Sequence, residues 1–411
     1  MKTTTDIRLL VLANQWPEPT SSAAGQHLLQ VLNLFYPLTD TIVIGYTAEK
    51  NNRSHIVSDD RFHSQRIHLN DASFDTFLIS YAPHIVVFDR FILEEQFGWR
   101  VSEHLPAAMK ILNTEDLHGL RSSREVALEK NVHWEELISS DSVMLRELAS
   151  IYRCDLSFII SEFEMQLLKK FDVPERLFCY VPFCIDTYAS PDSKSIPSFD
   201  EREGLIFIGN FLHRPNVDAI SFFTQNIWPT IRNQIRGIQC HIYGAYSPVN
   251  MKKTSQNGIV WHGAVDSTDD IVSRAKVNLA PLRFGAGLKG KVIEAMQNGL
   301  PSVMTEIAAE GIFGDFDSQL MVAKNWRHFT DMVVDLYTKP ERWYAAQSVG
   351  FDILRHRFDQ SIYAQQFAER VTTVLGNLEK HRKRNLTGAL LHRNGQQSTK
   401  YLAKWIEAKN S

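Results

Sequence analysis

Short apolar runs alternate with longer amphipathic stretches along the first half of the chain. The apolar runs have the length of strands and predict strands at 7–13, 41–46, 84–88, 109–113, 156–160 and 178–182. The amphipathic stretches predict helices at 23–36, 73–81, 91–104 and 162–171, and one long helix near 124–152. Strands that alternate with helices predict a parallel sheet with helices on both faces.

The same alternation restarts after residues 191–203, a segment rich in Ser, Pro and charge that predicts a linker. Beyond it we expect strands at 205–209, 239–243, 259–261, 277–282, 302–305 and 319–322, and helices at 217–227, 268–274, 291–298 and 326–337. The predicted fold class is α/β, with two doubly wound, Rossmann-like domains facing across a cleft. They cover residues 1–190 and 204–357, and residues 358–411 are expected to be helices that pack back on the first domain.

The composition is that of a globular protein with two domains. The chain has 411 residues, 44% of them apolar and 22% charged, and its net charge of −3 gives no drive toward nucleic acid. The four cysteines lack metal-type spacing and are expected to be free thiols in a reducing compartment. We found no signal-peptide pattern and no apolar run long enough to cross a bilayer, so a cytoplasmic location is expected. The basic run 380–384 predicts a solvated surface, with peripheral contact to the inner membrane face as the alternative.

One loop in the second half combines glycines with cations. Gly285, Gly287 and Gly290 have no Cβ to keep a ligand away from the backbone. Lys289 and Lys291 add positive charge just where the next helix is expected to begin. The free N–H groups of a helix N-terminus suit a phosphate or diphosphate, so we predict that such a group binds here. A turn that serves packing alone is the alternative, but it requires no charge.

Glu294 lies about one turn into that helix, within reach of a sugar hydroxyl attached to the phosphate. The loop also reads Gly-x-Gly-x-x-Gly, the pattern of dinucleotide-binding proteins. Its position late in the chain argues against that function, because the dinucleotide pattern follows the first strand of its domain. The Ser or Thr that follows Gly-Lys in nucleotide hydrolases is not present either.

Several segments resemble one enzyme family. They are GAGLKGKVIEAMQNGLPSVMT at 285–305 followed by Glu-Gly-Ile at 310–312, residues 207–216 with Trp-Pro at 228–229, residues 157–164, and residues 181–186. Because of these segments, the chain resembles the GT-B fold glycosyltransferases of family 4, in a bacterial subgroup of the glycosyl transferases group 1. The resemblance covers all of the chain except its C-terminal end. The resemblance implies transfer of a sugar from a UDP- or GDP-linked donor to an acceptor hydroxyl, with retention at the anomeric carbon. It implies no metal and no cofactor beyond this substrate.

The resemblance also implies an acceptor that is a saccharide, a lipid-linked sugar or a protein, and a role in cell-surface polysaccharide or glycoconjugate synthesis. Glu294 matches the second Glu of the family's Glu-x7-Glu pattern and is expected to bind the ribose, whereas Ala286 stands where the first Glu would be. The donor-binding residues predicted by loop and resemblance together are Gly25, Arg214, Arg283, Gly285, Gly287, Leu288, Lys289, Lys291, Glu294 and Glu310. Arg214, Arg283 and Lys289 are alternatives for the cations that stabilise the leaving diphosphate.

A polar cluster follows the apolar strand at 109–113. Many family members carry His-Asp at this strand end, and here the sequence has Glu115 and Asp116. Asp116, His118 and Arg121 are the candidates for contacts around the donor sugar or the acceptor, because strand-end loops carry the sites in this architecture. A structural or surface role is the alternative for each of them.

Three other functions were weighed. A nucleotide-sugar 2-epimerase shares the architecture but requires an acid and base pair that the sequence does not show. A non-catalytic scaffold protein of a polysaccharide assembly complex fits the absent first Glu. A dehydrogenase is disfavoured, because the turn after the first strand lacks the dinucleotide glycines.

Overall fold

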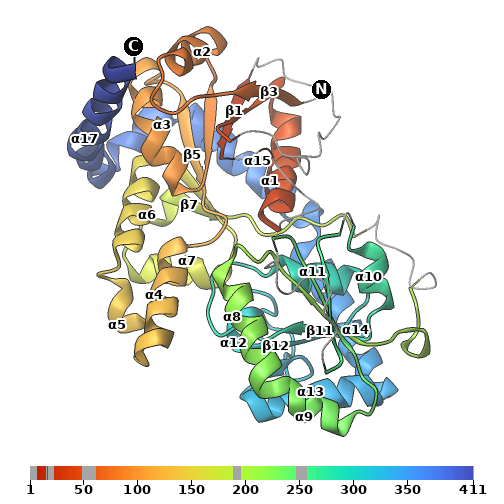
Figure 1. Cartoon of the computed structure of the whole chain (residues 1–411). Helices are drawn as coiled ribbons and strands as arrows, with labels where there is room; N and C mark the ends of the chain where they lie inside the picture. The colour runs from red at the N-terminus through yellow and green to blue at the C-terminus, as the bar shows by residue number, and fades with distance from the viewer. Residues whose placement is uncertain are drawn as a thin grey trace.

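The chain forms two α/β domains, shown in Figure 1 as the upper and lower halves of the molecule. The computed structural model describes residues 7–14, 16, 23–48, 62–187, 196–246, 257–265 and 267–410, without the side chains of 394–397 and 410. Each domain contains one sheet in which all neighbouring strands are parallel.

The sheet of the first domain has seven strands in the order β3-β2-β1-β4-β5-β6-β7. They are β1 (Arg8–Ala13), β2 (Thr41–Tyr46), β3 (Phe62–Arg66), β4 (Ile85–Asp89), β5 (Met109–Asn113), β6 (Leu156–Ile159) and β7 (Phe178–Tyr180). The connecting helices are α1 (Ala23–Phe35), η1 (Tyr36–Leu38), α2 (Ser73–Tyr81), α3 (Phe91–His104), α4 (His118–Lys130), α5 (Glu135–Ile138), α6 (Ser142–Arg153), α7 (Glu162–Lys170) and η2 (Glu175–Leu177). Strands β4, β5 and β6 are buried along their whole length, as expected for a parallel sheet covered on both faces.

The sheet of the second domain has six strands in the order β10-β9-β8-β11-β12-β13. They are β8 (Leu205–Ile208), β9 (Cys240–Tyr243), β10 (Ile259–Gly263), β11 (Val277–Ala280), β12 (Ser302–Thr305) and β13 (Val322–Ala323). Its helices are η4 (Phe199–Glu201), α8 (Arg214–Phe222), η5 (Phe223–Ile227), α9 (Trp228–Gln234), α10 (Asp269–Arg274), α11 (Gly290–Gln297), α12 (Glu306–Ala309), α13 (Trp326–Thr338), α14 (Pro340–Ile353) and η7 (Leu354–Phe358).

The sequence predicted these strands with small errors at their ends, but it missed β3. Strand β3 has the sequence FHSQR and no fully buried residue, because it forms the edge of its sheet. The single long helix predicted near 124–152 is wrong. It is three helices, since α4 ends at Asn131 in the left-handed conformation and α6 begins anew at Asp141, whose carboxylate caps Val143 and Met144.

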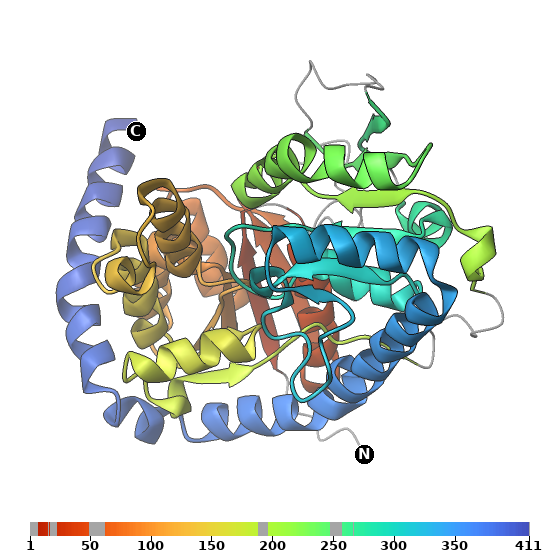
Figure 2. The ribbon, with the colours of Figure 1, turned by 90° about the horizontal axis from the view of Figure 1, so that it is seen from below.

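Three helices complete the chain: α15 (Gln360–Gly376), α16 (Leu378–Lys383) and α17 (Leu386–Asn410). Phe367 of α15 packs against Phe35 and Phe158 of the first domain, with ring centroids 4.9 and 5.2 Å apart. Helix α17 lies along α3 and α6 at the outer flank of that domain (Figures 1 and 2). Of the four free cysteines, three are buried and Cys179 is half-buried. Within the described residues, no helix is both long and apolar enough to cross a membrane.

Candidate functional site

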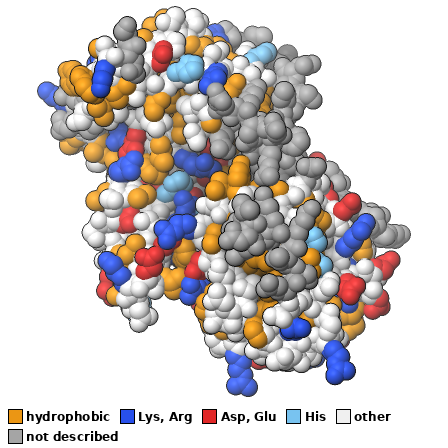
Figure 3. Space-filling view, viewed as in Figure 1, with side chains coloured by type: hydrophobic (Ala, Val, Ile, Leu, Met, Phe, Trp, Pro, Cys, Tyr) orange, Lys and Arg blue, Asp and Glu red, His pale blue; other side chains and the backbone are white. Residues whose placement is uncertain are grey.

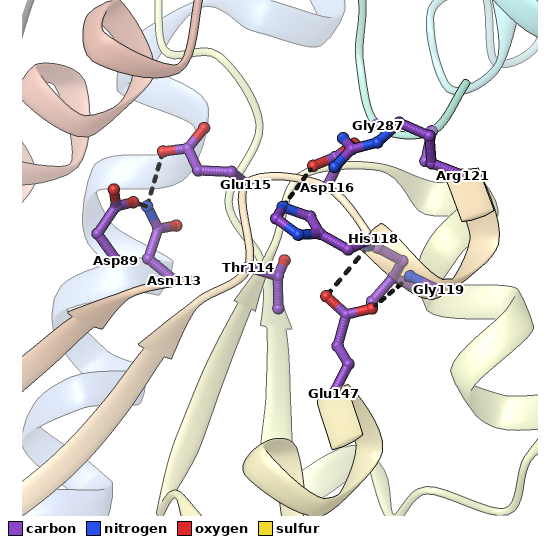
Figure 4. A network of polar contacts seen from close by, with 12 residues as sticks. Asp89, Asn113, Thr114, Glu115, Asp116, His118, Gly119, Arg121, Glu147 and Gly287 are labelled. Atoms are coloured by element: carbon purple, nitrogen blue, oxygen red, sulfur yellow. Dashed lines mark hydrogen bonds and ion pairs between the residues drawn. The ribbon is translucent and has the colours of Figure 1, made fainter. Parts of the chain in front are cut away.

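The glycine loop of the second domain touches the loop that follows β5 in the first domain. Gly287 has a φ of +66°, and a Cβ built on it would lie 2.8 Å from the Cβ of Asp116. Only glycine allows this backbone conformation without strain and this close an approach. Two loops that the sequence singled out separately therefore meet at the domain junction (Figure 4).

Asp116, His118 and Arg121 lie together at the start of α4, as Figure 4 shows. Asp116 Oδ1 is 3.2 Å from Nε2 of His118, and its other oxygen pairs with the guanidinium of Arg121. Burial alone would raise the pKa of Asp116, but the charges of Arg121 and His118 hold it well below its usual value. The Asp116 carboxylate is therefore ionised and a weak base.

Glu147 supports this cluster from below (Figure 4). Its carboxylate accepts hydrogen bonds from the backbone N–H of His118 at 3.2 Å and of Gly119 at 3.1 Å. These are N–H groups of the first turn of α4, which have no partner inside the helix. Glu147 thus fixes the direction of α4 and of the side chains on its first turn.

Glu115 belongs to a second network on the same loop, and its φ of +61° turns it away from Asp116. Its carboxylate accepts a hydrogen bond from Asn113 Nδ2 at 2.8 Å and lies 3.2 Å from His27 Nδ1. Asn113 Nδ2 also donates to Asp89 at 3.3 Å. Burial raises the pKa of Asp89 to about 6, with the charge of Glu115 as a smaller cause. This buried network holds the end of β5 and hence the position of Asp116.

Two buried side chains of the first domain hold the backbone of the glycine loop. Arg124 Nη1 donates to the carbonyl of Gly285 at 2.7 Å, and Glu164 Oε1 accepts from the N–H of Gly287 at 2.9 Å. Arg124 also forms a bidentate ion pair with Glu310, with distances of 2.6 and 2.8 Å. The conformation of the loop is thus set across the domain junction.

The sequence analysis missed Arg124 and Glu164. Both lie on first-domain helices, far from the glycine loop along the chain. Arg124 belongs to no recognised motif, and Glu164 ends the segment 157–164, to which the resemblance gave no contact with the loop. Glu310 was predicted to bind the donor, and in the structure its carboxylate is occupied by Arg124. Its direct partner is therefore a protein side chain, and donor binding by Glu310 stays a prediction.

Lys289 and Lys291 are close to the glycine loop, as predicted. Lys289 Nζ donates to the carbonyls of Ala286 and Gly287 at 2.9 and 2.5 Å, and Lys291 Nζ donates to Asn216 Oδ1 at 2.7 Å. Burial lowers the pKa of Lys289 to about 8. Burial, and then repulsion by Lys289, lower the pKa of Lys291 to about 7. An anion bound beside these ammonium groups would favour their charged forms.

Helix α11 begins at Gly290, directly after Lys289, and its N-terminus meets that of α1. A Cβ on Gly290 would be 2.5 Å from the Cβ of Ala23, the first residue of α1. Gly25, one of the predicted donor-binding residues, is buried in the first turn of α1. Two helix N-termini from different domains thus converge at one place, and both favour negative charge.

Glu294 lies on α11, one turn beyond Gly290. Its carboxylate accepts a hydrogen bond from the hydroxyl of Thr268, and burial raises its pKa. Leu288 is buried, and its side chain lies 2.9 Å from the position that a Cβ on Gly311 would take. The prediction that Glu294 binds a ribose stays a prediction.

The two predicted arginines pair with acids. Arg283 is paired with Asp218, with 2.8 Å between Nε and Oδ2. Arg214 is 70% exposed and reaches across to α4, where its Nε lies 2.6 Å from Glu125. His213, which the sequence did not predict, lies near the Asp116 cluster. Desolvation, and then the charge of Arg121, lower the pKa of His213 to about 4. On the face shown in Figure 3, Lys, Arg and His side chains gather in the hollow between the domains.

Two cavities are lined by residues outside the glycine loop. One of about 400 Å³ is lined by residues of α1 and α15. The other, of about 680 Å³, runs along α7 and is lined by Trp134, Phe163, Tyr180 and Gly311 among others. Neither is lined by Lys289 or Glu294. The chemistry at the domain junction, not the size of a cavity, therefore selects the candidate site.

Comparisons with known proteins bear on the fold and on the class of enzyme. Residues 202–339, most of the second domain, match the family model of the glycosyl transferases group 1. No significant match was found among curated protein sequences. The match supports the prediction that the chain is a glycosyltransferase, while membership in family 4 and in a bacterial subgroup stays a prediction.

Solved structures with the same architecture include sucrose-phosphate synthase from Thermosynechococcus elongatus. It has a TM-score of 0.68 and 12% identity, with 90% of this chain and 99% of that chain covered. Anabaena HepE in complex with UDP and glucose has a TM-score of 0.63 and 12% identity over 89% and 100% of the two chains. The pneumococcal O-GlcNAc transferase GtfA, in complex with UDP and GlcNAc, has a TM-score of 0.64 and 11% identity over 90% and 99%. The predicted GT-B fold is confirmed.

Proposed function

We propose that the chain transfers a sugar from a nucleoside diphosphate sugar to an acceptor hydroxyl, with the donor bound at the glycine loop and α11. The observation that carries this proposal is the junction itself. The N-termini of α11 and α1 converge there beside Lys289 and Lys291, and the glycine loop packs on Asp116. UDP is the first candidate nucleotide, because HepE and GtfA bind it. GDP is the alternative.

The diphosphate is proposed to bind the free N–H groups of α11, with Lys291 and Lys289 supplying positive charge. The ribose then reaches Glu294, one helical turn further along. One oxygen of the Glu294 carboxylate accepts from the Thr268 hydroxyl, and the other oxygen can accept hydrogen bonds from ribose hydroxyls. The pKa of Glu294 is raised by burial, and two ribose hydroxyls would favour its charged form again.

The sugar is proposed to lie beside the contact between Gly287 and Asp116, where the two domains touch. Asp116 is ionised and a weak base, so it fits the binding of sugar hydroxyls or the stabilisation of positive charge at the anomeric carbon, not proton removal. We propose that an oxygen of the leaving diphosphate accepts the proton of the acceptor hydroxyl on the same face. This route retains the anomeric configuration and requires no metal.

The wider role is part of the proposal. We propose that the acceptor is a saccharide, a lipid-linked sugar or a protein, and that the product is a cell-surface polysaccharide or glycoconjugate. A cytoplasmic location with peripheral contact to the inner membrane face fits such an acceptor. A scaffold protein of the same fold would bind the nucleotide sugar without releasing nucleoside diphosphate, and a 2-epimerase would change the sugar without an acceptor.

A thermal-shift screen of UDP, GDP and their sugars tests the binding step. A ligand at one hundred times its Kd stabilises the folded state by about 2.7 kcal/mol, so one nucleotide should raise the melting temperature clearly. Glu294→Ala should remove most of that shift, whereas Glu341→Ala, which removes an exposed carboxylate of α14, should leave it unchanged. Release of nucleoside diphosphate from the best sugar then separates an enzyme from a scaffold. An equal shift in both variants would place the nucleotide elsewhere.

A further inference from the structure

Helix α17 has small residues on its inner face. A Cβ on Gly388 would lie 2.2 Å from the carbonyl oxygen of Tyr152, so only glycine fits at this contact. Ala403, further along the same face, is 3% exposed. His392 lies between them and is 2.8 Å from the carbonyl of Arg153. The inner face of α17 thus fits closely on α6.

The outer face of α17 carries large apolar residues, each more than half exposed: Leu386, Leu390, Tyr401, Leu402 and Trp405. Steps of four and eleven residues place Leu386, Leu390, Tyr401 and Trp405 on one stripe, opposite Gly388. A surface helix of a globular protein normally has the reverse arrangement, with its apolar stripe toward the core. In the space-filling view, apolar side chains gather at the position of α17 (Figure 3).

The C-terminal segment also differs from the rest of the chain in charge. Residues 380–411 contain eight Lys and Arg residues but one acidic residue, Glu407, whereas the whole chain has 44 basic and 47 acidic residues. Glu407 is paired with Arg100 of α3 on the inner side of the helix. Arg393 flanks the apolar stripe, and Lys409 lies over the ring of Trp405 at 5.2 Å, whereas Lys404 Nζ lies 3.8 Å from Glu103 of α3.

We propose that the outer face of α17 docks on an anionic lipid surface. An apolar stripe with Trp and Tyr, flanked by Lys and Arg, is the arrangement of helices that lie in the membrane interface. The cations match the negative potential of anionic lipids, and the apolar side chains enter the acyl boundary. A second copy of this chain would bring the same cations face to face, which disfavours self-association through this face.

The placement of α17 fits docking. Both ribbon views show the helix at the outer flank of the first domain, on the side away from the second domain (Figures 1 and 2). A bilayer against this flank would not cover the junction between the domains. The docking proposal therefore stands apart from the proposed transfer reaction, and either can fail without the other.

Vesicle flotation tests the proposal with the full chain. The wild type should float with vesicles of equal parts phosphatidylglycerol and phosphatidylcholine, and about tenfold less with phosphatidylcholine alone. The variant Tyr401→Ser/Leu402→Ser/Trp405→Ser should lose at least tenfold in bound fraction on the anionic vesicles. Its melting temperature should be unchanged, because these side chains are exposed. Arg393→Glu/Lys409→Glu, which changes two exposed cations, should lose binding too, and high salt should weaken binding of the wild type.

The matched control is Leu69→Ser/Ile79→Ser/Leu128→Ser, which removes three exposed apolar residues from other surfaces of the first domain. It should float like the wild type. The proposal is overturned if the control loses as much binding as the α17 variant, or if the wild type stays unbound on anionic vesicles. It is also overturned if light scattering shows a dimer that only the α17 substitutions dissociate.

Discussion

Removing the carboxylate of Glu164 should destabilise the domain junction and weaken nucleotide binding together. Glu164 is fully buried, and its Oε1 accepts hydrogen bonds from Leu117 N at 2.8 Å and from Gly287 N at 2.9 Å. One N–H belongs to the strand-end loop of the first domain and the other to the glycine loop of the second. Glu164→Ala leaves both without their acceptor.

Each buried N–H group left without a partner costs about 1–3 kcal/mol. Water entering the space of the missing side chain offsets part of this cost, so we expect Glu164→Ala to lower the free energy of unfolding by about 2–4 kcal/mol. Glu164→Gln keeps an oxygen acceptor at the position of Oε1. Below pH 4.5, where Glu164 keeps its proton in the folded and the unfolded state, this variant should therefore stay within about 1 kcal/mol of the wild type.

The pH dependence adds a second signature. Burial raises the pKa of Glu164 to about 8, from 4.5 in the unfolded chain. Between those pH values the folded state keeps the proton of Glu164, whereas the unfolded state releases it. The unfolding free energy of the wild type should therefore fall relative to that of Glu164→Gln as the pH rises from 4.5 to about 8. Below pH 4.5, the difference in unfolding free energy between the wild type and Glu164→Gln should not change with pH.

Equilibrium unfolding in urea measures the stability, and titration with nucleoside diphosphate measures the binding. Glu147→Ala is the control, because Glu147 also accepts two backbone N–H groups in the first domain but does not contact the glycine loop. It should destabilise the fold and weaken nucleotide binding less than Glu164→Ala does, because its effect on the glycine loop is only indirect, through Arg124 of α4. If Glu164→Ala is as stable as Glu164→Gln and binds the nucleotide as tightly, the loop is not held from the first domain.

Three further predictions concern the donor site. Glu294→Ala should raise the KM for the nucleotide sugar about tenfold or more, because a charged hydrogen bond is worth about 1.5–3 kcal/mol, and an unchanged KM would remove Glu294 from the ribose site. Burial lowers the pKa of Lys291 to about 7, so nucleoside diphosphate should bind more weakly, and with proton uptake in calorimetry, as the pH rises from 7 to 9. Lys291→Met should reduce that pH dependence and leave the part that Lys289 contributes, whose pKa is about 8, and the assignment fails if the dependence is unchanged. Gly287→Ala should slow turnover and lower the unfolding free energy by at least about 1 kcal/mol, because φ is +66° and the new methyl would clash with Asp116. A variant that turns over as fast as the wild type would contradict the packing of this loop on Asp116.

The sequence could predict the elements that depend on local patterns. Buried strands such as β2, β5 and β12 appear as apolar runs, and the structure has them at the predicted residues. Strand β3 could not be predicted in this way, because an edge strand with polar side chains has no apolar signal. The break between α4 and α6 was missed because its determinants are single residues, Asn131 and Asp141, inside a stretch of otherwise helical composition.

In the candidate site too, the sequence could predict only the residues that belong to local motifs. Gly287 and Asp116 each stood out in a local motif, and the structure brings them into contact. Arg124 and Glu164 are ordinary helix residues in the sequence, and only the approach of the two domains gives them partners on the glycine loop. The acid partners of Arg283 and Arg214 were missed for the same reason, since an ion pair between distant segments leaves no pattern in either segment.

A crystal structure of the chain with UDP, or with GDP if the screen selects it, tests the central claim most directly. Our account predicts the diphosphate at the N-terminus of α11, within hydrogen-bond distance of the backbone N–H of Gly290 or Lys291, and the ribose hydroxyls on Glu294. A nucleotide bound in the cavity along α7, or one whose ribose lies away from Glu294, would contradict it.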